Sequence, residues 1–293
     1  MTSPPSALTQ SSWMTLNLWH VLRLAAEKFI DDDMPTYAAA LAYRLLFALF
    51  PFLIFLTTLL GVLGIPQLFD WMQTQAAYMV PQSAMDHVNR ILSEIQKPNG
   101  RLLSLGIVLA MWAASAAARG TINALNIAYD VKERRPTWKR LFLSVTYTAG
   151  LALMLLCAAA MMVTGPSVAE WIVHYIGLDA MFAMMWALAR WPVTVVLLLV
   201  VVSTVYYAAP NVSHPFRFFT PGSLLAVTLW IAASVCFSLY VQNFGKYSET
   251  YGSIGAVIVL LFYFYISSAV LLFGGEVNAV IDRLCDRPPK AKA

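Results

Sequence analysis

Long apolar runs alternate with short polar connections along almost the whole of this 293-residue chain. Six runs are each about 18 residues or longer and nearly free of charge, which suits helices crossing the roughly 30 Å hydrocarbon core of a bilayer. They cover residues 37–64, 102–119, 141–163, 186–208, 222–242 and 254–281. None has the period of two expected of barrel strands, and lipid cannot satisfy the backbone of an open sheet. We therefore predict an all-α membrane protein with six transmembrane helices.

The segments outside these runs have their own patterns. Residues 13–29 place apolar side chains on one stripe, with tryptophans beside it, which predicts an amphipathic N-terminal helix at the membrane interface. The first loop is long and has helical apolar spacing, so we expect a helical external loop, either a lid or a pair of surface helices without a ligand. The predicted organisation is an N-terminal arm (1–36), a six-helix transmembrane domain (37–281) and a basic tail (282–293).

Composition and charge set the orientation. Hydrophobic residues make up 60% of the chain and charged residues 12%, against roughly 25% charged in soluble domains. Of the 19 lysines and arginines, 13 fall on one side of the predicted membrane, in the N-terminal arm, the second and fourth loops and the tail. The positive-inside rule places this side, with both termini, in the cytoplasm. The net charge of +4 therefore reports topology, and no nucleic-acid partner is expected.

Proline and glycine mark expected irregularities within the spans. Pro51 falls in the middle of the first span, where it removes a backbone hydrogen bond and predicts a kink. The last run would be about 42 Å long as one helix, so it must tilt, extend beyond the lipid or break. We favour a break at Gly252 and Gly255.

Two charged residues lie inside spans. Glu276 and Arg44 are each about 9 to 12 Å from the same predicted cytoplasmic face. A lone charge at such depth costs roughly 2.5–3.5 kcal/mol on insertion scales, so polar partners or a wet cavity are the usual remedy. Three interpretations stay open: an ion pair that clamps two helices, a gate or substrate contact, and separate snorkelling of each side chain. Arg119 is an alternative partner for Glu276, whereas Asn278 projects elsewhere and suits helix packing.

Several segments together carry a family resemblance. RGTINALNIAYDVKERRPTWKR, PGSLLAVTLW, and YGSIGAVIVLLFYFYIS followed by GGEVNA resemble the YihY/virulence factor BrkB family of bacterial inner-membrane proteins, over roughly residues 25–282. The resemblance implies six spans with both termini inside, in the bacterial inner membrane. The motif positions are Asn123, Asn126, Tyr129, Asp130, Glu133, Arg134, Pro136, Pro221, Gly222, Tyr251 and Asn278.

Members of this family have often been labelled ribonuclease BN, a tRNA-processing enzyme. Metal-dependent hydrolysis needs clustered ligands, but the four histidines are scattered and no nucleotide-binding or nucleophile motif is present. We therefore expect no enzyme, no catalytic residue, no metal and no cofactor. The basic loop DVKERRPTWKR either signals topology alone or binds anionic lipid headgroups.

Two classes of function remain. The kinked first helix and the buried charges favour transport or export of a lipid or envelope component. A structural or scaffolding envelope protein, in which the same polar groups only lock helices together, is the alternative. Membrane lipids are the expected partners in either case.

Overall fold

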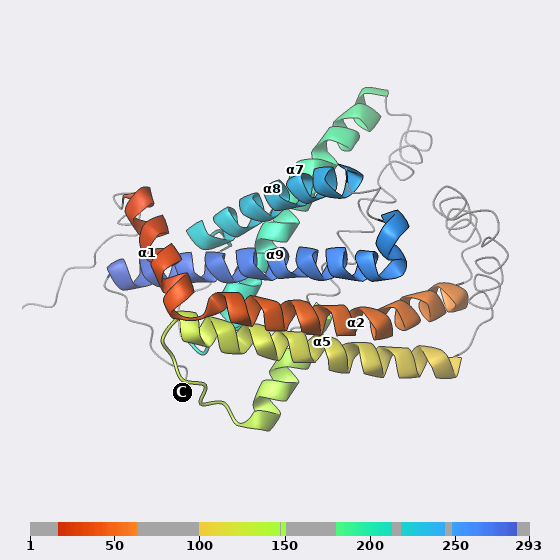
Figure 1. The fold of residues 1–293 in the computed structure, drawn as a ribbon, viewed down its shortest axis with the longest axis horizontal. Helices are drawn as coiled ribbons and strands as arrows, with labels where there is room; N and C mark the ends of the chain where they lie inside the picture. Colours follow the sequence, from red (N-terminus) through yellow and green to blue (C-terminus); the bar gives the residue numbers. More distant parts are fainter. Residues whose placement is uncertain are drawn as a thin grey trace, which may run out of the picture. The chain divides into compact units, whose positions relative to one another are not determined.

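A computed structural model describes residues 17–63, 100–146, 148–150, 180–212, 218–243 and 248–285 (Figure 1). The regular elements of these ranges are helices. They are α1 (Leu18–Asp31), α2 (Met34–Leu63), α5 (Gly100–Ala128), α7 (Ala180–Ala208), α8 (Pro221–Asn243) and α9 (Ser248–Leu284). The chain forms two compact units: a smaller unit, residues 44–117, and a larger unit made of residues 1–43 and 118–293.

Five of the described helices are long and apolar enough to cross a membrane. The segments are Met34–Phe55, Ser104–Ala128, Trp191–Ala208, Pro221–Val241 and Val257–Leu284. They match five of the six predicted spans. Of the remaining one, 141–163, only residues 141–146 and 148–150 are described, and these are helical. The predicted external loop and Trp13 lie outside the described residues.

The α9 helix corrects the predicted break. Its 37 residues are helical without interruption, through Gly252 and Gly255, although the ribbon turns near its N-terminal end (Figure 1). Lipid offers no partner for a freed backbone group, so continuous helical hydrogen bonding is the stable solution even where glycine weakens the helix. Pro51 likewise lies inside α2, which continues past it.

The α5 helix also runs further than expected. The second span was predicted to end at residue 119, but α5 continues to Ala128 because its apolar spacing persists. The turn that follows α5 contains Asp130, which has a φ of 52°, and Asp33 has a φ of 53° in the turn between α1 and α2. Aspartate tolerates this left-handed conformation better than most side chains. Thr36 donates a hydrogen bond from Oγ1 to Asp33 Oδ1 (2.8 Å), which secures the start of α2.

In the smaller unit, α2 and α5 approach closely. A Cβ atom added at Gly106 would lie 3.0 Å from the Cα of Phe55, so a larger residue has little room there. Arg44 donates from Nη1 to the carbonyl oxygen of Ala116 (3.2 Å). Small residues thus allow the two backbones to pack tightly, as in other membrane helix pairs.

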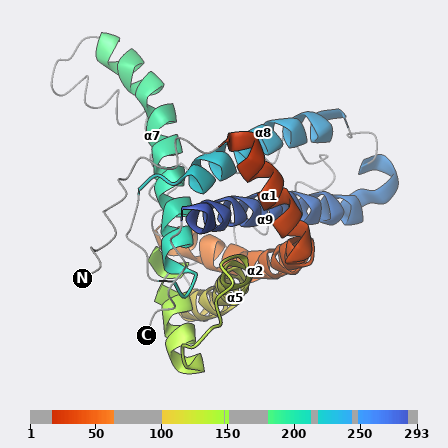
Figure 2. The same ribbon diagram turned by 90° about the vertical axis from the view of Figure 1, so that its left-hand side faces the viewer.

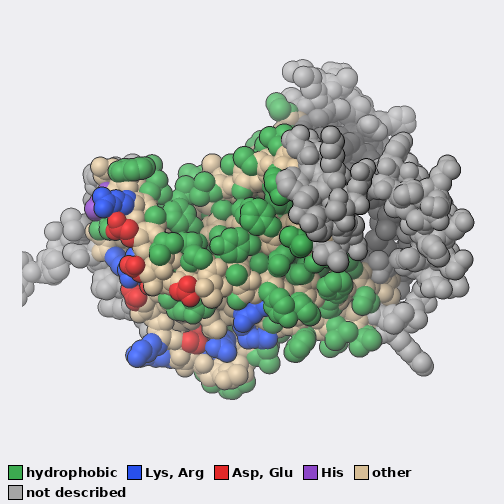
Figure 3. Space-filling view, in the orientation of Figure 1, with side chains coloured by type: hydrophobic (Ala, Val, Ile, Leu, Met, Phe, Trp, Pro, Cys, Tyr) green, Lys and Arg blue, Asp and Glu red, His purple; other side chains and the backbone are tan. Residues whose placement is uncertain are grey.

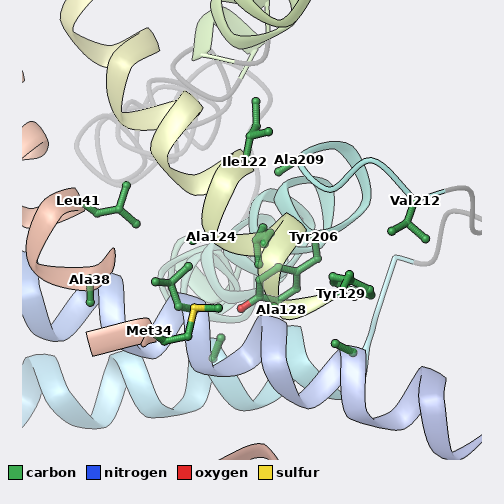
Figure 4. Close-up of a cluster of buried hydrophobic side chains, with 14 residues drawn as sticks. Met34, Ala38, Leu41, Ile122, Ala124, Ala128, Tyr129, Tyr206, Ala209 and Val212 are labelled. Atoms are coloured by element: carbon green, nitrogen blue, oxygen red, sulfur yellow. The ribbon is translucent and has the colours of Figure 1, made fainter. Parts of the chain in front are cut away.

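The core of the larger unit lies where α5, α7 and α9 meet the first turns of α2. Its fully buried side chains include Met34, Leu125, Tyr206 and Leu272. Figure 4 shows Tyr206 among Ala124, Ala128 and Met34. Its hydroxyl donates to the carbonyl oxygen of Leu271 at 2.6 Å, so the one polar atom of this large side chain is satisfied inside the core.

The α8 and α9 helices pack through glycine. A Cβ at Gly222 would collide with the carbonyl oxygen of Gly274, so the two backbones are nearly in contact. Asn278 then caps α8: its Oδ1 accepts from Gly222 N (2.9 Å), and its Nδ2 donates to Thr220 Oγ1 (3.0 Å). The first amide groups of a helix lack partners within the helix, and this side chain supplies one. Asn278 therefore has the packing role that the sequence suggested.

The α1 helix lies across the C-terminal part of α9 (Figure 2). Val21 and Ala25 are buried against Val277 and Val280, while Leu18 and Trp19 are exposed. Of the helix predicted for residues 13–29, the part from Leu18 onward lies in the described residues and is helical, and its buried side chains are Val21 and Ala25.

We predict that Gly222→Ala will destabilise the protein by about 1–3 kcal/mol or more, because the added methyl group forces α8 and α9 apart. Thermal unfolding of the purified protein in detergent measures the effect. Gly150→Ala is the matched control, since nothing lies within 4 Å of a Cβ at that position. Equal melting temperatures for the two variants would contradict the close approach.

Candidate functional site

The stretch GGEVN, residues 274–278, is the point at which other helices of the larger unit meet α9. Gly274 faces Tyr206 of α7 and Gly222 of α8. A Cβ at Gly275 would collide with Leu125 of α5. Val277 packs on α1 and Asn278 caps α8. Four helices therefore contact α9 through four of these five residues.

Glu276 is the remaining residue of that stretch, and it differs from its neighbours. Its side chain is fully buried, with 0% exposure, and neither carboxylate oxygen has a hydrogen-bond partner among the described residues. It lies in the segment of α9 long enough to cross the membrane. Buried polar groups are normally hydrogen-bonded, so a bare carboxyl group at such a position needs an explanation beyond packing.

Charged groups of both signs surround this carboxyl group. Those that act on it electrostatically are Asp32, Arg283, Lys28 and Asp130. Asp32 follows α1. Its Oδ2 is buried and has no hydrogen-bond partner in the described ranges, while its Oδ1 lies 3.8 Å from Lys28 Nζ. Figure 3 shows the charged side chains of α1 beside the hydrophobic surface over α8 and α9. Two acids and two bases largely cancel, so the surroundings offer Glu276 no net positive charge.

The C-terminal end of α5 is tied to the last turn of α9. Arg283 Nη2 lies 2.7 Å from Asp130 Oδ2 and also donates to the carbonyl oxygen of Ala128 (2.6 Å). The chain turns at Asp130, and this side chain therefore pairs with α9, whereas Glu133 pairs locally with Arg135. Tyr129 lies just past the span, and burial, followed by the acidic groups of Asp282 and Glu276, raises the pKa of its hydroxyl, which therefore stays protonated.

A second polar group, the Asn126 network, consists of Asn126, Glu133, Arg135, Pro210 and Asn211. Asn126 donates from Nδ2 to Glu133 Oε2 (2.9 Å) and accepts from Asn211 N (2.7 Å). Arg135 donates to Asn211 Oδ1 (3.1 Å) and to the carbonyl oxygen of Pro210 (3.0 Å), and it lies 3.8 Å from Glu133. These bonds fix the loop after α5 to the segment after α7.

The predicted partners of Glu276 are placed as follows. Arg119 belongs to the larger unit and is half-buried in α5, and it does not hydrogen-bond Glu276. Arg44 belongs to the smaller unit, so its pairing with Glu276 stays a prediction. Neither placement distinguishes a clamp from a gate.

The motif residues divide into two groups. Asn126, Glu133, Asp130, Gly222 and Asn278 take part in the contacts given above. Pro221 is the first residue of α8, which suits the fixed φ of proline. Of the others, Asn123 is half-buried in α5, Arg134 and Pro136 are exposed in the following loop, and Tyr251 lies in α9.

Within the described ranges, no three His, Cys, Asp or Glu side chains come together in a way that could hold a metal ion.

The sequence profile of the family described as "Virulence factor BrkB" matches residues 25–293. The chain belongs to the BrkB family. Among its relatives, the ribonuclease-like protein YfkH of Bacillus subtilis is 38% identical over 84% of this chain and 89% of its own length. A UPF0761 membrane protein of Xanthomonas campestris is 26% identical over 87% of this chain. Another, from Pseudomonas paraeruginosa, is 29% identical over 86% of this chain. No solved structure matches.

This BrkB chain spans only 59% and 60% of the Xanthomonas and Pseudomonas relatives. The match to the family profile confirms the resemblance suggested by the sequence motifs. Those motifs include Asn126, Asp130 and Arg135, but they do not include the partners Asn211 and Arg283. Arg283 follows Glu276 by two helical turns and so shares its face of α9, which was a usable signal.

We predict that Arg135→Lys will destabilise this BrkB protein by about 1.5–3 kcal/mol, because an ammonium group cannot reproduce the forked bonds to Asn211 and Pro210. Thermal unfolding in detergent checks this. Arg134→Lys is the control, because Arg134 is the exposed neighbour and keeps its charge. If Arg134→Lys lowers the melting temperature as much, the network is not what holds the loop.

Charge exchange tests the predicted ion pair. We expect Glu276→Arg to lower membrane abundance strongly, because an unpaired charge in a span costs roughly 2.5–3.5 kcal/mol. We expect adding Arg44→Glu not to restore it, because Glu276 has no hydrogen-bond partner among the residues described. Quantitative immunoblotting of membranes from the native host provides the measurement. Recovery of abundance in the double exchange would instead establish an Arg44–Glu276 clamp.

Proposed function

We propose that this BrkB protein transports or exports a lipid or another envelope component across the bacterial inner membrane. The single observation behind the proposal is Glu276, a fully buried carboxyl group inside a membrane span that has no hydrogen-bond partner in the described part of the chain. Ionisable groups at such positions are costly and commonly mark substrate or ion pathways. The family membership supports a membrane protein, and the transport role is our addition to it.

The proposed orientation has both termini in the cytoplasm. It rests on the distribution of lysine and arginine along the sequence, 13 of 19 on one side. In this arrangement Glu276, Asp130 and Arg283 lie near the cytoplasmic face. A substrate would then meet the charged end of α9 from that side.

The loop after α5 supplies a further element of the proposal, contact with anionic lipid headgroups. Lys132, Arg134 and Lys139 are exposed there, and basic side chains at the cytoplasmic face attract acidic lipids. Arg135 is set apart from them, because 92% of its side chain is covered and its bonds go to protein groups. The headgroup contacts would therefore fall to the three exposed cations.

A scaffold without a transported substrate is the second candidate. It is favoured by the polar side chains that join helices: Tyr206 to α9, Asn278 to α8, and Trp230, whose Nε1 donates to Ser267 Oγ (3.1 Å). In membranes such bonds stabilise helix packing. Glu276 sets the two candidates apart, because a group that only locked helices together would be expected to have a partner.

A tRNA-processing ribonuclease is the third candidate. YfkH is named as a ribonuclease-like protein, and the older family label, ribonuclease BN, also suggests this activity. We place it last because the four histidines are scattered along the sequence and suit no hydrolytic metal centre. We propose no catalytic residue and no cofactor.

Reconstitution in lipid vesicles tests the proposal. We expect the purified protein to move a headgroup-labelled phosphatidylethanolamine between leaflets. The movement is measured as the increase, relative to protein-free vesicles, in the fraction of fluorescence that an impermeant reductant quenches. Glu276→Gln should reduce the rate at least about tenfold, equivalent to roughly 1.4 kcal/mol in the barrier, if the carboxyl group acts in the movement.

Two controls accompany this experiment. Arg134→Lys retains the cationic surface of the basic loop and should transport at the wild-type rate. Abundance and melting temperature of Glu276→Gln show whether the protein still folds. If vesicles with the wild-type protein show the same quenched fraction as protein-free vesicles, both with this lipid and with an anionic labelled lipid, the result would count against lipid transport and favour the scaffold.

A further inference from the structure

The carboxyl group of Glu276 has neither water nor a hydrogen-bond donor of the described residues to stabilise a negative charge. Moving an isolated carboxylate from water into an apolar surrounding costs tens of kcal/mol in the simple continuum limit, whereas an unbonded neutral polar group costs roughly 2–7 kcal/mol. The packed state shown here therefore strongly disfavours the ionised form.

The side chains around Glu276 do not reverse this preference. From α1 and the turn after it come Lys28 and Asp32, from the end of α5 come Tyr129 and Asp130, and from α9 itself comes Arg283. Lys28 lies near Asp32, at 3.8 Å, and Arg283 is paired with Asp130, at 2.7 Å. Both nearby cations are thus already engaged by other acids.

We propose that Glu276 is a proton-binding site, which holds a proton while α1, the end of α5 and α9 are packed around it and releases the proton to water when these helices separate. The step is a simple dissociation: the carboxyl O–H bond breaks, its electron pair stays on oxygen and the proton passes to water. The site rests on geometry alone. Only its use as the coupling ion for substrate movement rests on the proposed function.

The position of Glu276 explains how the proton and the packing are linked. The residues on either side of Glu276 contact two other helices. Gly275 contacts Leu125 of α5, and Val277 packs against α1. Separation of α1 or α5 from α9 would admit water to the carboxyl group, and an ionised carboxylate would in turn oppose the return of these helices. Protonation and closure are therefore reciprocal, as linkage requires.

Infrared difference spectroscopy of the full-length protein in lipid vesicles tests the proposal. The spectrum of Glu276→Gln is subtracted from that of the wild type at neutral pH. We expect a carbonyl band of a protonated carboxyl group in the difference, which is lost as the pH is raised and replaced by carboxylate bands. Carboxylate bands already present at neutral pH would overturn the proposal.

Glu133→Gln is the matched control. Glu133 is also shielded from solvent, with 15% side-chain exposure, but it accepts bonds from Asn126 and Arg135, so its difference spectrum should contain carboxylate bands only. The same measurement with sodium exchanged for choline separates a proton site from a sodium site, because bands of Glu276 that follow sodium and not pH would overturn the proposal.

Two further outcomes are informative. Failure of Glu276→Gln to accumulate would contradict the proposal, because an amide of the same shape should replace a neutral carboxyl group. A protonated band together with no lipid movement in the vesicle assay would leave the proton site standing and remove the proposed transport. Failure of one idea is therefore distinguishable from failure of the other.

Discussion

The larger unit depends on one constraint. Residues 274–278, which hold the helices together, include the carboxyl group of Glu276, whose burial disfavours a negative charge. Around Glu276, the neighbouring residues 274, 275, 277 and 278 contact α7, α8, α5 and α1. Glycines allow the backbones to approach, and Asn278 satisfies the exposed start of α8. Any movement of these helices relative to α9 therefore changes the surroundings of the carboxyl group.

The polar groups of this protein fall into two kinds, and the difference bears on function. Asn126, Asn278 and Arg135 form hydrogen bonds between segments distant in sequence and have the partners expected of structural residues. Glu276 has none. Structural polar groups in membranes are retained because they are satisfied. A polar group that is retained without hydrogen-bond partners is better explained by another conformation, in which it meets a proton, water or a substrate.

The sequence predicted the helices well, because apolar runs of sufficient length identify spans with little help from tertiary structure. It also indicated Glu276 and Asn278 as residues of interest, and Pro221 as the start of a helix. It could not predict Asn211 as the partner of Asn126, which lies 85 residues away, or Arg283 as the partner of Asp130. Such contacts depend on which helices meet, and one chain gives no periodic signal for that. The break expected at Gly252 was wrong because lipid penalises an open backbone more than glycine weakens a helix.

Accessibility of position 276 is the most direct test of whether Glu276 works in a site that opens. With the three native cysteines replaced by serine, Glu276→Cys is exposed to a membrane-impermeant thiol reagent from the cytoplasmic side. Leu284→Cys, at an exposed position, and Ala124→Cys, at a fully buried one, give the reference rates of fast and slow labelling. We predict slow labelling of Cys at position 276, clearly faster than labelling at position 124. Labelling no faster than at position 124 would mean that the site stays sealed, and would contradict a working role for Glu276.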